Sequence, residues 1–543
     1  MNIKDELKKI LKGEIVDDEL SLKHYSRDAS LFQIKPKIVV FPKDVEDIKK
    51  LAVFAGKNKN ISLTPRSGGT DMTGGPLGDS VVVDMTKYFN RIEKIGEDYA
   101  IVEPGVYYRD FEKETLKHGL LLPSYPASRE ICTVGGMVGN NSGGEKTLSY
   151  GKTEQYVEEL NAVFQDGNEY TVKPLTKEEL DKKLSENTFE SNLYKSVFEL
   201  IQKNYEAIRA AKPRVSKNSA GYYLWNVWDG KTFDLTKLLV GSQGTLGIIT
   251  KIKFRLIKPK KHSTLLVALL KDIKPLADIA NRVLAHSPES FESYDDHTLK
   301  LAMRYIFQII KFMKTKNFIA LGWRFLPEVW MGLTGGFPKL VLIAEFTGDS
   351  EEEARNKAEA AKKDLATFNI KTRVTKSKQE AQKYWVMRRE SFNLLRRNIK
   401  DKHTAPFIDD FVVRPEQLPE FLPRLDKILT KYPGLIYTIA GHVGDGNFHI
   451  IPLMNLADPQ TAKIIPELSE KVYKLVFEFK GSTTGEHNDG LIRTPYLESM
   501  YGEKIYGLFR EVKKIFDSNN IFNPKKKVDA DMNYALSHLV SKY

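Results

Sequence analysis

Short apolar runs, separated by polar turns rich in glycine and proline, recur through the first half of the chain. Strands are predicted at residues 37–41, 61–65, 81–85 and 99–105, where apolar and largely β-branched residues follow one another. Between the first two strands, the pattern of residues 42–58 predicts a helix. Because strands and helices are mixed throughout, the predicted fold class is α+β, with α/β as the alternative.

A second set of strands begins after residue 257 and indicates a second domain, so we place the boundary near residue 260. Strands are predicted at residues 263–270 and 340–346, followed by a Glu-, Ala- and Lys-rich helix over residues 350–366. The start of the chain is charged and predicts a helical leader that runs into a loop. The expected organisation is this leader and two domains, at residues 1–32, 33–260 and 261–543.

The composition restricts the class of protein. Of 543 residues, 41% are hydrophobic, which is enough for the cores of about two to four domains and excludes a wholly disordered chain. The single cysteine, Cys132, excludes an internal disulfide, a structural cysteine zinc site and an iron–sulfur cluster, and fits a reducing compartment. The net charge of +12 favours an anionic partner, such as an acidic cofactor, a carboxylate substrate, a membrane surface or nucleic acid.

The sequence contains no pattern typical of a secretory signal or of a membrane-spanning helix. Its first residues are charged and amphipathic, and no stretch approaches about 18 apolar residues free of charge. A cytoplasmic location is therefore expected. Nucleic acid is not expected as a partner, because the basic residues are scattered and no recognition motif accompanies them.

Residues 301–340 differ from the rest of the chain as a basic and aromatic insertion. They combine six Lys and Arg residues with eight interleaved aromatic residues and a single acid, Glu328. This composition suits peripheral contact with the inner face of a membrane. The alternative is an insertion that packs on its own domain or on a partner subunit.

A glycine-rich turn follows the strand predicted at 61–65, with the sequence Thr64-Pro-Arg-Ser-Gly-Gly-Thr-Asp-Met-Thr-Gly-Gly. Glycines let successive backbone N–H groups converge on one anion, because no Cβ blocks the approach. Arg66 and the neighbouring hydroxyl groups add donors, so a pyrophosphate fits this turn. The motif is neither Gly-x-Gly-x-x-Gly nor a P-loop, so those nucleotide sites are poorly supported. A surface turn without a ligand is the alternative.

Two further glycine clusters occur in the first half. Residues 123–144 combine many small and hydroxyl residues, which would let a large planar ligand lie close to the backbone. Residues 239–250 predict a tight turn that enters a strand.

The second half contains two histidine-bearing loops. In the first, Ala440-Gly-His-Val-Gly-Asp-Gly-Asn-Phe-His-Ile, the glycines permit the turn that would bring His442 and His449 to one site. The second loop contains Glu486 and His487. Two imidazoles and one carboxylate make a divalent metal site with open positions. His487 is a candidate general base, because imidazole titrates near neutral pH.

Each of the two loops also has an interpretation without a functional site. The first is a Gly/Asp turn that carries two unrelated histidines, and the second is an exposed Glu-His pair.

Together, the three glycine clusters resemble the PCMH-type FAD-binding domain of the vanillyl-alcohol oxidase-like flavoproteins, in the branch of glycolate oxidase subunits and D-lactate and D-2-hydroxyglutarate dehydrogenases. The likeness covers about residues 25–543. It implies pyrophosphate contacts from Arg66, Ser67, Gly68, Gly69, Thr70 and Asp71. It also implies flavin-ring and ribityl contacts from Ser128, Thr133, Gly136, Asn140, Ser142 and Gly143, and an adenine-side contact near Ile248.

The histidine loops resemble the Gly-His-x-Gly-Asp-Gly-Asn-x-His and Gly-Glu-His-Gly signatures of the FAD-linked oxidase C-terminal domain in the same family. This likeness implies that three residues bind zinc or manganese: His442, His449 and Glu486. It makes His487 the base that removes the hydroxyl proton, and it assigns Asn447 to orienting the substrate.

The segment Tyr384-Trp-Val-Met-Arg-Arg-Glu-Ser-Phe resembles a Trp-x-x-Arg segment of the same family. There Arg388 would bind the substrate carboxylate bidentately. Arg389 is the alternative in register, and a basic helix face is the alternative without a ligand.

Three positions depart from the family pattern. Thr70 stands where many relatives attach FAD through a histidine, so FAD is expected to be non-covalent. Asn488 replaces the glycine that follows the Glu-His pair, in a turn that Asn tolerates better than other non-glycine residues do. Ile408 stands where the D-2-hydroxyglutarate enzymes have a lysine, which weakens a dicarboxylate assignment.

The resemblance implies FAD-dependent oxidation of a D-2-hydroxy acid, of the D-lactate, glycolate or D-2-hydroxyglutarate type, to the 2-oxo acid. The electron acceptor would be a quinone, a cytochrome, a carrier flavoprotein or a separate iron–sulfur subunit. The iron–sulfur subunit is considered because the C-terminal residues resemble a sub-branch that is fused to a cysteine-rich domain, and this chain lacks those cysteines. The alternative is a flavoprotein subunit without its own turnover, which the departures at Asn488 and Ile408 would explain.

Overall fold

A computed structural model describes residues 3–296, 298–300, 338–398, 402–432, 435–437 and 439–540, and of residues 390–398 only the helical backbone. Most of the insertion at 301–340 lies outside the described residues, so its membrane contact stays a prediction. Helices and strands are mixed along the chain, which confirms the α+β class. Two small two-stranded sheets accompany three larger ones: β9 (Leu175–Thr176) with β10 (Thr232–Phe233), and β16 (His403–Thr404) with β20 (Leu453–Met454).

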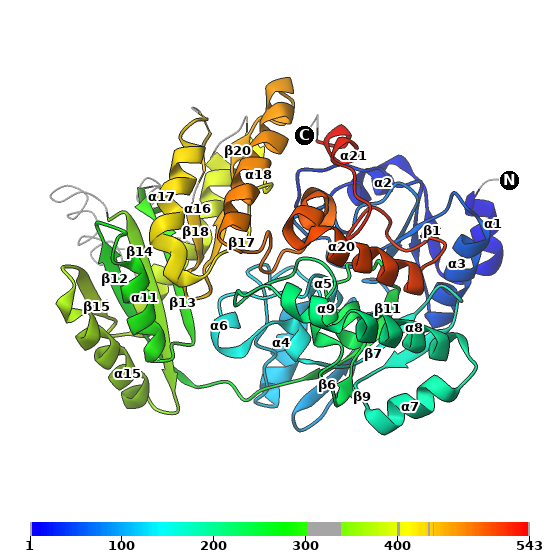
Figure 1. Ribbon diagram of the computed structural model, residues 1–543, viewed down its shortest axis with the longest axis horizontal. Coiled ribbons are helices and arrows are strands. Elements are labelled where there is room, and N and C mark those ends of the chain that lie inside the picture. The colour runs from blue at the N-terminus through cyan, green and yellow to red at the C-terminus, as the bar shows by residue number, and fades with distance from the viewer. Residues whose placement is uncertain are drawn as a thin grey trace.

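The first half contains a four-stranded and a five-stranded sheet, on the right in Figure 1. The four-stranded sheet has the order β1 (Glu14–Val16), β2 (Ile38–Phe41), β4 (Val81–Asp84), β3 (Leu63–Arg66). The antiparallel five-stranded sheet has the order β5 (Ile92–Ile95), β6 (Tyr99–Val102), β11 (Ile248–Arg255), β7 (Val157–Val163), β8 (Glu169–Val172). Part of the expected leader is therefore a strand, because β1 pairs with β2.

The helices described in the first half lie before and between the strands of these two sheets. They are α1 (Ile3–Ile10), α2 (Glu19–Tyr25), α3 (Val45–Lys57), α4 (Tyr108–Lys117), α5 (Val134–Asn140), α6 (Thr147–Tyr150), α7 (Lys177–Ser185), α8 (Phe189–Lys203), α9 (Tyr205–Ala211) and α10 (Thr236–Leu239). Helix α5 carries part of the second glycine cluster, and Thr133 caps its N-terminus through a hydrogen bond from the backbone N–H of Gly136.

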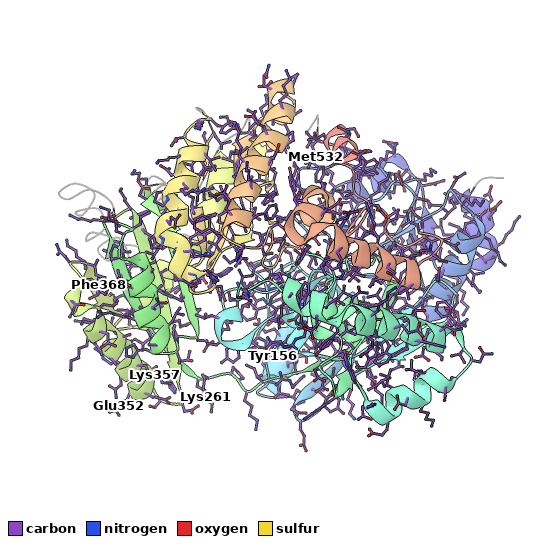
Figure 2. All side chains as sticks on the ribbon, viewed as in Figure 1. Tyr156, Lys261, Glu352, Lys357, Phe368 and Met532 are labelled. Atoms are coloured by element: carbon purple, nitrogen blue, oxygen red, sulfur yellow. The ribbon has the colours of Figure 1, made fainter. Side chains whose placement is uncertain are left out.

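A seven-stranded antiparallel sheet forms the second half, on the left in Figure 1. Its order is β15 (Lys371–Val374), β12 (His262–Leu270), β14 (Leu340–Gly348), β13 (Ser290–Asp295), β18 (Ile439–His442), β19 (Asn447–Ile450), β17 (Phe411–Val412). The connection from the first half passes Lys261, labelled in Figure 2, between the end of β11 and the start of β12.

Both faces of the central strands β12, β13 and β14 are buried, and alternate residues of these strands face opposite cores. Leu266 and Ala268 belong to the core with α11 (Leu276–Ala285), α15 (Glu351–Asp364), α17 (Leu418–Leu429) and α18 (Pro459–Glu478). Leu265 and Val267 belong to the core with α16 (Lys378–Asn398). Among the helices that the structure describes, none combines the length and the apolar character needed to cross a bilayer.

After α19 (Gly490–Arg493) the chain returns to the first half. The expected boundary at residue 260 assigned these C-terminal residues to the second domain. Helix α20 (Leu497–Phe516) packs in the same hydrophobic core as α8 and α9, and lies over the right half of Figure 1. The next residues, Ile521 and Phe522, join the core beneath the four-stranded sheet, and the short helix α21 (Met532–Ser537) follows. The loop that carries Glu486 and His487 is therefore held between the two halves of the molecule.

Candidate active site

The two histidines of the first loop lie on one face of the β18–β19 hairpin. His449 pairs directly opposite Ala440, and His442 follows two residues later on the same strand as Ala440, so both imidazoles point to the same side. The turn between the strands requires glycine at Gly446, where φ is +65° and a Cβ would lie 1.7 Å from the carbonyl oxygen of Val413. This sequence therefore brings the two histidines together through local backbone geometry.

Three imidazoles converge on one oxygen of Glu486. The Nε2 atoms of His442, His449 and His487 lie 3.3, 3.4 and 4.0 Å from Glu486 Oε1. The rings of His449 and His487 are stacked, with their centroids 5.0 Å apart. The residues predicted from the two loops therefore meet at a single point, although their positions in the chain differ by more than thirty residues.

The opposite ring nitrogen of each imidazole is held by a buried carboxylate. Glu292, on the neighbouring strand β13, binds Nδ1 of His442 at 2.6 Å. Asp409 binds Nδ1 of His449 at 3.0 Å and Nδ1 of His487 at 2.5 Å. Carboxylates in this position fix the tautomer and orientation of metal-binding histidines. The arrangement leaves each Nε2 directed at Glu486.

Asp410 holds the loop that carries Glu486 and His487. Its Oδ2 accepts hydrogen bonds from the backbone N–H groups of Glu486 at 3.0 Å and His487 at 2.7 Å, and from the hydroxyl of Thr484 at 2.5 Å. Asp410 also lies near enough to His449, Glu486 and His487 to form part of a metal-binding cluster. Because its carboxylate already accepts these bonds and a further one from Asn447, it fits the anchoring role better.

The charges in the cluster are strongly coupled. Burial raises the pKa of Glu486, but Lys217 and His442 outweigh it and hold that pKa well below its usual range. Burial lowers the pKa of His449, yet Asp409 outweighs it and raises the pKa to about 10. For His487, the charges of Asp409 and Asp410 likewise overcome burial, and its pKa stands above the ordinary value. These imidazoles have a high affinity for positive charge, whether a proton or a metal cation.

The two adjacent arginines of α16 have different surroundings. Arg388 lies 3.1 Å from Glu292, the carboxylate that holds His442, and its buried Nε has no hydrogen-bond partner among the described residues. Arg389 instead binds Glu145 through both carboxylate oxygens, at 2.6 and 2.7 Å, and stacks over the ring of Trp385. Arg388 therefore faces the histidine cluster with a donor to spare, which favours it over Arg389 as a carboxylate-binding residue.

Asn447 lies behind the cluster. It is fully buried, and its Nδ2 donates to the Asp410 carboxylate at 3.0 Å and to the carbonyl oxygens of Asp410 and Phe411. Its Oδ1 has no hydrogen-bond partner among the described residues. These contacts fit a residue that positions Asp410, and the implied role of Asn447 in orienting the substrate stays a prediction.

The first and second glycine clusters are joined by side-chain hydrogen bonds. Thr133 Oγ1 donates to Ser67 Oγ at 2.6 Å, and Asn140 Nδ2 donates to Asp71 Oδ1 at 2.7 Å. Arg66 lies beneath the turn, where its Nη2 donates to the carbonyl oxygen of Arg27 at 2.7 Å. The guanidinium therefore supports the loop from the protein side, and the implied pyrophosphate contact of Arg66 stays a prediction.

The third cluster joins the second through the backbone. The N–H of Gly241 donates to the carbonyl oxygen of Val138 at 2.8 Å, and the N–H of Gln243 donates to that of Gly139 at 2.9 Å. Ile248 follows as the first residue of β11 and is buried in the core beneath the sheets. All three glycine clusters thus form one structural unit.

The accessible part of this unit has little side-chain bulk. Residues 67–70 and the α5 residues Gly136, Gly139 and Asn140 are half-buried, whereas their neighbours are mostly buried. A Cβ at Gly139 would meet nothing within 4 Å, so open space lies beside the helix backbone. This combination of glycine, hydroxyl and amide groups fits a cofactor that approaches the backbone closely, as FAD would.

The glycine unit and the histidine cluster touch each other. A Cβ at Gly143 would lie 3.2 Å from Glu486 Oε2. The side-chain amide of Asn488 donates to the carbonyl oxygens of Asn140 at 3.1 Å and Gly241 at 2.9 Å. Asn488 adopts the left-handed conformation, with φ of +70°, that the replaced glycine of the family pattern would favour. The predicted cofactor loops and the predicted metal loop are therefore one site.

Comparison with protein families decides which kind of protein this is. The model for the C-terminal domain of FAD-linked oxidases matches residues 259–527, and the FAD-binding domain model matches residues 36–173. The chain belongs to the FAD-linked oxidase family. The first match contains the histidine cluster, and the second contains the first two glycine clusters.

Curated relatives of this FAD-linked oxidase include a D-2-hydroxyglutarate dehydrogenase of Pseudomonas putida, 27% identical over 95% of the chain. The chain spans only about half the length of that relative, 50% of it. A glycolate oxidase subunit of Bacillus subtilis is 27% identical over 98% of the chain and 97% of the relative. Among solved structures, 4-ethylphenol oxidase from Gulosibacter chungangensis covers 98% of this chain and 97% of its own at a TM-score of 0.68 and 14% identity, which shows a common fold.

Cys132 and Ser128 lie in one turn beside the first glycine cluster. The Cys132 thiol is buried, and burial raises its pKa to about 12, which disfavours the thiolate. The carbonyl oxygen of Ser128 accepts hydrogen bonds from the N–H groups of Ile131 and Cys132 in the same turn. That turn borders the first glycine cluster, since a Cβ at Gly68 would lie 3.0 Å from the carbonyl oxygen of Ile131.

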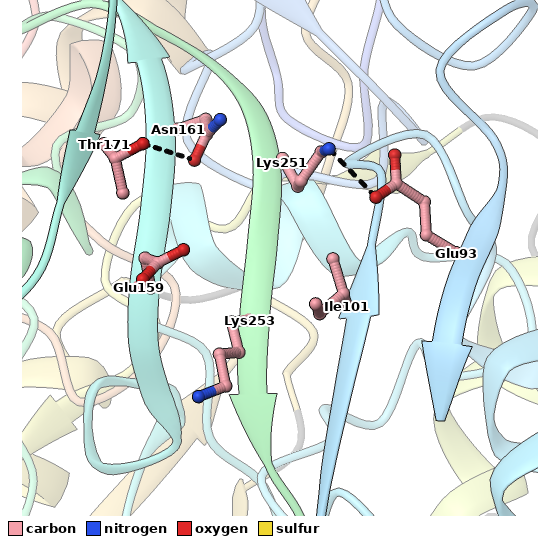
Figure 3. A pocket seen from close by; sticks show the side chains of 7 residues that line it. All are labelled: Glu93, Ile101, Glu159, Asn161, Thr171, Lys251 and Lys253. Atoms are coloured by element: carbon pink, nitrogen blue, oxygen red, sulfur yellow. Dashed lines mark hydrogen bonds and ion pairs between the residues drawn. The ribbon is translucent and has the colours of Figure 1, made fainter. Parts of the chain in front are cut away.

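A hollow on the open face of the five-stranded sheet lies apart from the cluster (Figure 3). Its charged and polar side chains pair with one another across the strands, as Lys251 does with Glu93 at 2.9 Å and Thr171 with Asn161 at 3.3 Å. It contains no imidazole or cysteine. This pattern is that of a solvated sheet face.

Four residues around the cluster were not expected from the sequence as parts of the site: Glu292, Asp409, Asp410 and Lys217. Only Asp409 and Asp410 carried a signal, as two consecutive acids directly before a short apolar strand. Glu292 lies within a strand and is 1% exposed. The alternation of Glu292 with apolar neighbours predicts a strand. It does not predict the hydrogen bond with His442, which lies 150 residues later in the chain.

Proposed function

We propose that the protein oxidises a D-2-hydroxy acid to the 2-oxo acid, with non-covalent FAD and a divalent zinc or manganese ion. One observation carries the proposal: three imidazole Nε2 atoms lie within 3.3–4.0 Å of one oxygen of Glu486, while its other oxygen lies against Gly143 of the cofactor loop. Support also comes from relatives named D-2-hydroxyglutarate dehydrogenase and glycolate oxidase subunit.

The donor set fits a divalent cation. His442, His449 and Glu486 would hold it, with Glu292 and Asp409 keeping the two imidazoles in the required tautomer. A bound cation supplies Lewis acidity toward the substrate hydroxyl. Two nitrogen ligands and one carboxylate leave positions open for the substrate's own oxygens.

His487 would accept the hydroxyl proton at Nε2. Its Nδ1 is bound by Asp409 at 2.5 Å, which favours the tautomer with the proton on that nitrogen, and in the neutral ring Nε2 then presents the lone pair. The charges of Asp409 and Asp410, which raise the pKa of His487, also stabilise the imidazolium that forms. The other candidate role for His487 is that of a fourth metal ligand. The metal content of the variant His487→Ala distinguishes the base from the ligand.

Arg388 would bind the substrate carboxylate. Its position beside Glu292 places it next to the histidine that would hold the cation, and its buried, unpartnered Nε is a donor that a carboxylate would satisfy. The substrate would thus be held between a guanidinium and the metal, with its carboxylate and hydroxyl oxygens fixed separately.

The glycine unit would hold FAD, through Ser67 to Asp71 at the pyrophosphate and through Thr133, Gly136, Asn140, Ser142 and Gly143 at the flavin. Bound FAD supplies the acceptor for two electrons and the hydrogen of the substrate Cα. Asn488 and Asp410 would keep His487 and Glu486 in place beside it, by the hydrogen bonds that tie their loop to both halves.

FAD is expected to leave the protein on denaturation. Thr70 stands at the position of the histidine that carries the flavin in many relatives, and a threonine hydroxyl cannot form that bond. Acid precipitation of the purified protein should leave the yellow colour in the supernatant. Yellow colour that stays with the washed pellet would contradict the proposal.

The electrons would pass to a separate acceptor, which is a quinone, a cytochrome, a carrier flavoprotein or an iron–sulfur subunit. The glycolate oxidase subunit of Bacillus subtilis is similar to this chain over 97% of its own length, and its name as a subunit supports a partner protein here as well. The same name supports the second candidate function, a flavoprotein subunit without its own turnover. The complete donor set at Glu486 and the intact turn at Asn488 favour the oxidising enzyme.

The test of the proposed function is anaerobic reduction of the flavin by 2-hydroxy acids. The panel contains both enantiomers of lactate and 2-hydroxyglutarate, with glycolate and D-malate. Rapid loss of the visible flavin absorbance with one D-acid, and not with its L-enantiomer, is the expected result. A yellow protein that no acid of the panel reduces would favour the subunit without turnover.

A further inference from the structure

Lys217 is a fully buried lysine beside the cluster that the proposed chemistry does not yet use. It lies in the segment after α9, and its side chain is 0% exposed. Its ammonium group lies 3.2 Å from Glu486 Oε2, 3.5 Å from Asp445 Oδ2 and 3.2 Å from the carbonyl oxygen of Gly144. An ammonium group has three N–H donors, and these three acceptors can satisfy all of them.

The two oxygens of Glu486 are therefore separated by their partners. Oε1 faces the imidazoles, at 3.3 Å from His442 and 3.4 Å from His449. Oε2 faces Lys217 and accepts its hydrogen bond. A carboxylate can bind a cation through one oxygen or through both, and the choice decides how many coordination positions stay open.

We propose that Lys217 is a positioning residue that restricts Glu486 to binding the cation through Oε1 alone. The hydrogen bond from the ammonium group occupies Oε2 and keeps the carboxylate from turning both oxygens toward the imidazoles. This inference rests on the metal centre of the proposed function. Its consequence is that coordination positions needed by the substrate's carboxylate and hydroxyl oxygens stay open.

Lys217 also connects this carboxylate to the cofactor loop. The carbonyl oxygen of Gly144, one residue beyond Gly143, accepts from the same ammonium group. Asp445, in the turn of the histidine hairpin, is its third partner. One side chain thus binds the loop of the first half, the hairpin of the second half and the carboxylate between them, so its removal should change the coordination of the cation.

The test is the visible absorption spectrum of Co²⁺ bound to the apoprotein, because the bands of Co²⁺ report the number and geometry of its ligands. We compare the wild type with Lys217→Met, which removes the donor to Oε2. The expected result is a changed spectrum in the variant, Zn²⁺ binding about ten times tighter or more because a like charge near the cation is lost, and a KM for the D-acid raised about tenfold or more. If Lys217→Met does not fold, Lys217→Gln is measured in its place, since it also lacks the ammonium group.

Lys513→Met is the matched control. Lys513 is another buried lysine, but its ammonium group donates to the carbonyl oxygens of Thr245 and Phe522 and to the carboxylate of Asp517, and not to the Glu486 carboxylate. Its Co²⁺ spectrum should match that of the wild type even where the fold is less stable.

Two outcomes would overturn the inference, and they differ. A Lys217 variant that binds Co²⁺ with the wild-type spectrum would show that Glu486 is positioned without Lys217, while the metal centre stands. A wild-type protein that takes up neither Co²⁺ nor Zn²⁺ would remove the metal centre itself, and the inference with it.

Discussion

Replacing His487 by alanine is expected to slow anaerobic reduction of the flavin by the D-acid about 10²- to 10⁴-fold, the usual contribution of a general base. The imidazole is held by Asp409 with its Nε2 toward Glu486, and neither of the other two imidazoles of the cluster can take its place without giving up a proposed metal contact. Stopped-flow recording of the flavin absorbance measures the effect directly. FAD content should not change, because His487 lies outside the glycine unit.

Metal content separates the two roles of His487. If His487 is the base, the alanine variant retains one divalent ion per chain while its rate falls. Loss of the ion together with the rate would make His487 a ligand and contradict its assignment as the base. His286→Ala is the matched control: this histidine pairs with the exposed Asp364, outside the cluster, and the rate of that variant should equal that of the wild type.

Replacing Arg388 by methionine is expected to lower kcat/KM for the D-acid about 10²- to 10⁴-fold. A bidentate contact with a carboxylate consists of two charge-assisted hydrogen bonds, each worth about 1.5–3 kcal/mol, and every 1.4 kcal/mol is a factor of ten. The loss should appear mainly as a higher KM, since the variant keeps His487 and the metal ligands. Titration of flavin reduction against the concentration of the acid measures both parameters.

Arg389→Met is the control for Arg388. The guanidinium of Arg389 is already bound by both oxygens of Glu145, so its loss should weaken the contact between the two halves and change KM less than tenfold. A larger effect at Arg389 than at Arg388 would reverse the assignment and support the alternative register.

Elements defined by local chemistry could be predicted from the sequence. The helix expected at 350–366 is α15 (Glu351–Asp364), and it begins where the side chain of Ser350 accepts a hydrogen bond from the N–H of Glu353. The apolar run expected at 263–270 is β12, whose alternate residues face two cores. Such caps and alternations lie within a few residues of one another, and a pattern search along the chain detects them.

The organisation of the molecule was predicted less completely. The expected leader contains β1, which pairs with β2 more than twenty residues later. Helix α20 leaves the second half and packs in the core of the first. Neither contact has a local signal, because strand pairing and helix docking depend on distant partners that one apolar stretch does not identify.

The candidate site shows the same limit. His442, His449, Glu486 and His487 could be found because each lies in a loop with a recognisable pattern, and the structure brings them together. The residues that orient these side chains could not be found in this way. Lys217 belongs to a polar stretch that predicts a loop, and its hydrogen bond with Glu486 joins residues that are 269 positions apart in the chain.

In the proposed function, a metal ion and FAD act on one D-acid at the junction of the two halves. The most direct measurement is flavin bleaching by the reactive D-acid, recorded before chelation, after chelation with removal of the chelator, and after addition of Zn²⁺ or Mn²⁺. We expect rapid bleaching at first, almost none after chelation with FAD still bound, and recovery with one equivalent of metal. Bleaching that continues at the original rate in protein shown to be free of metal would contradict it.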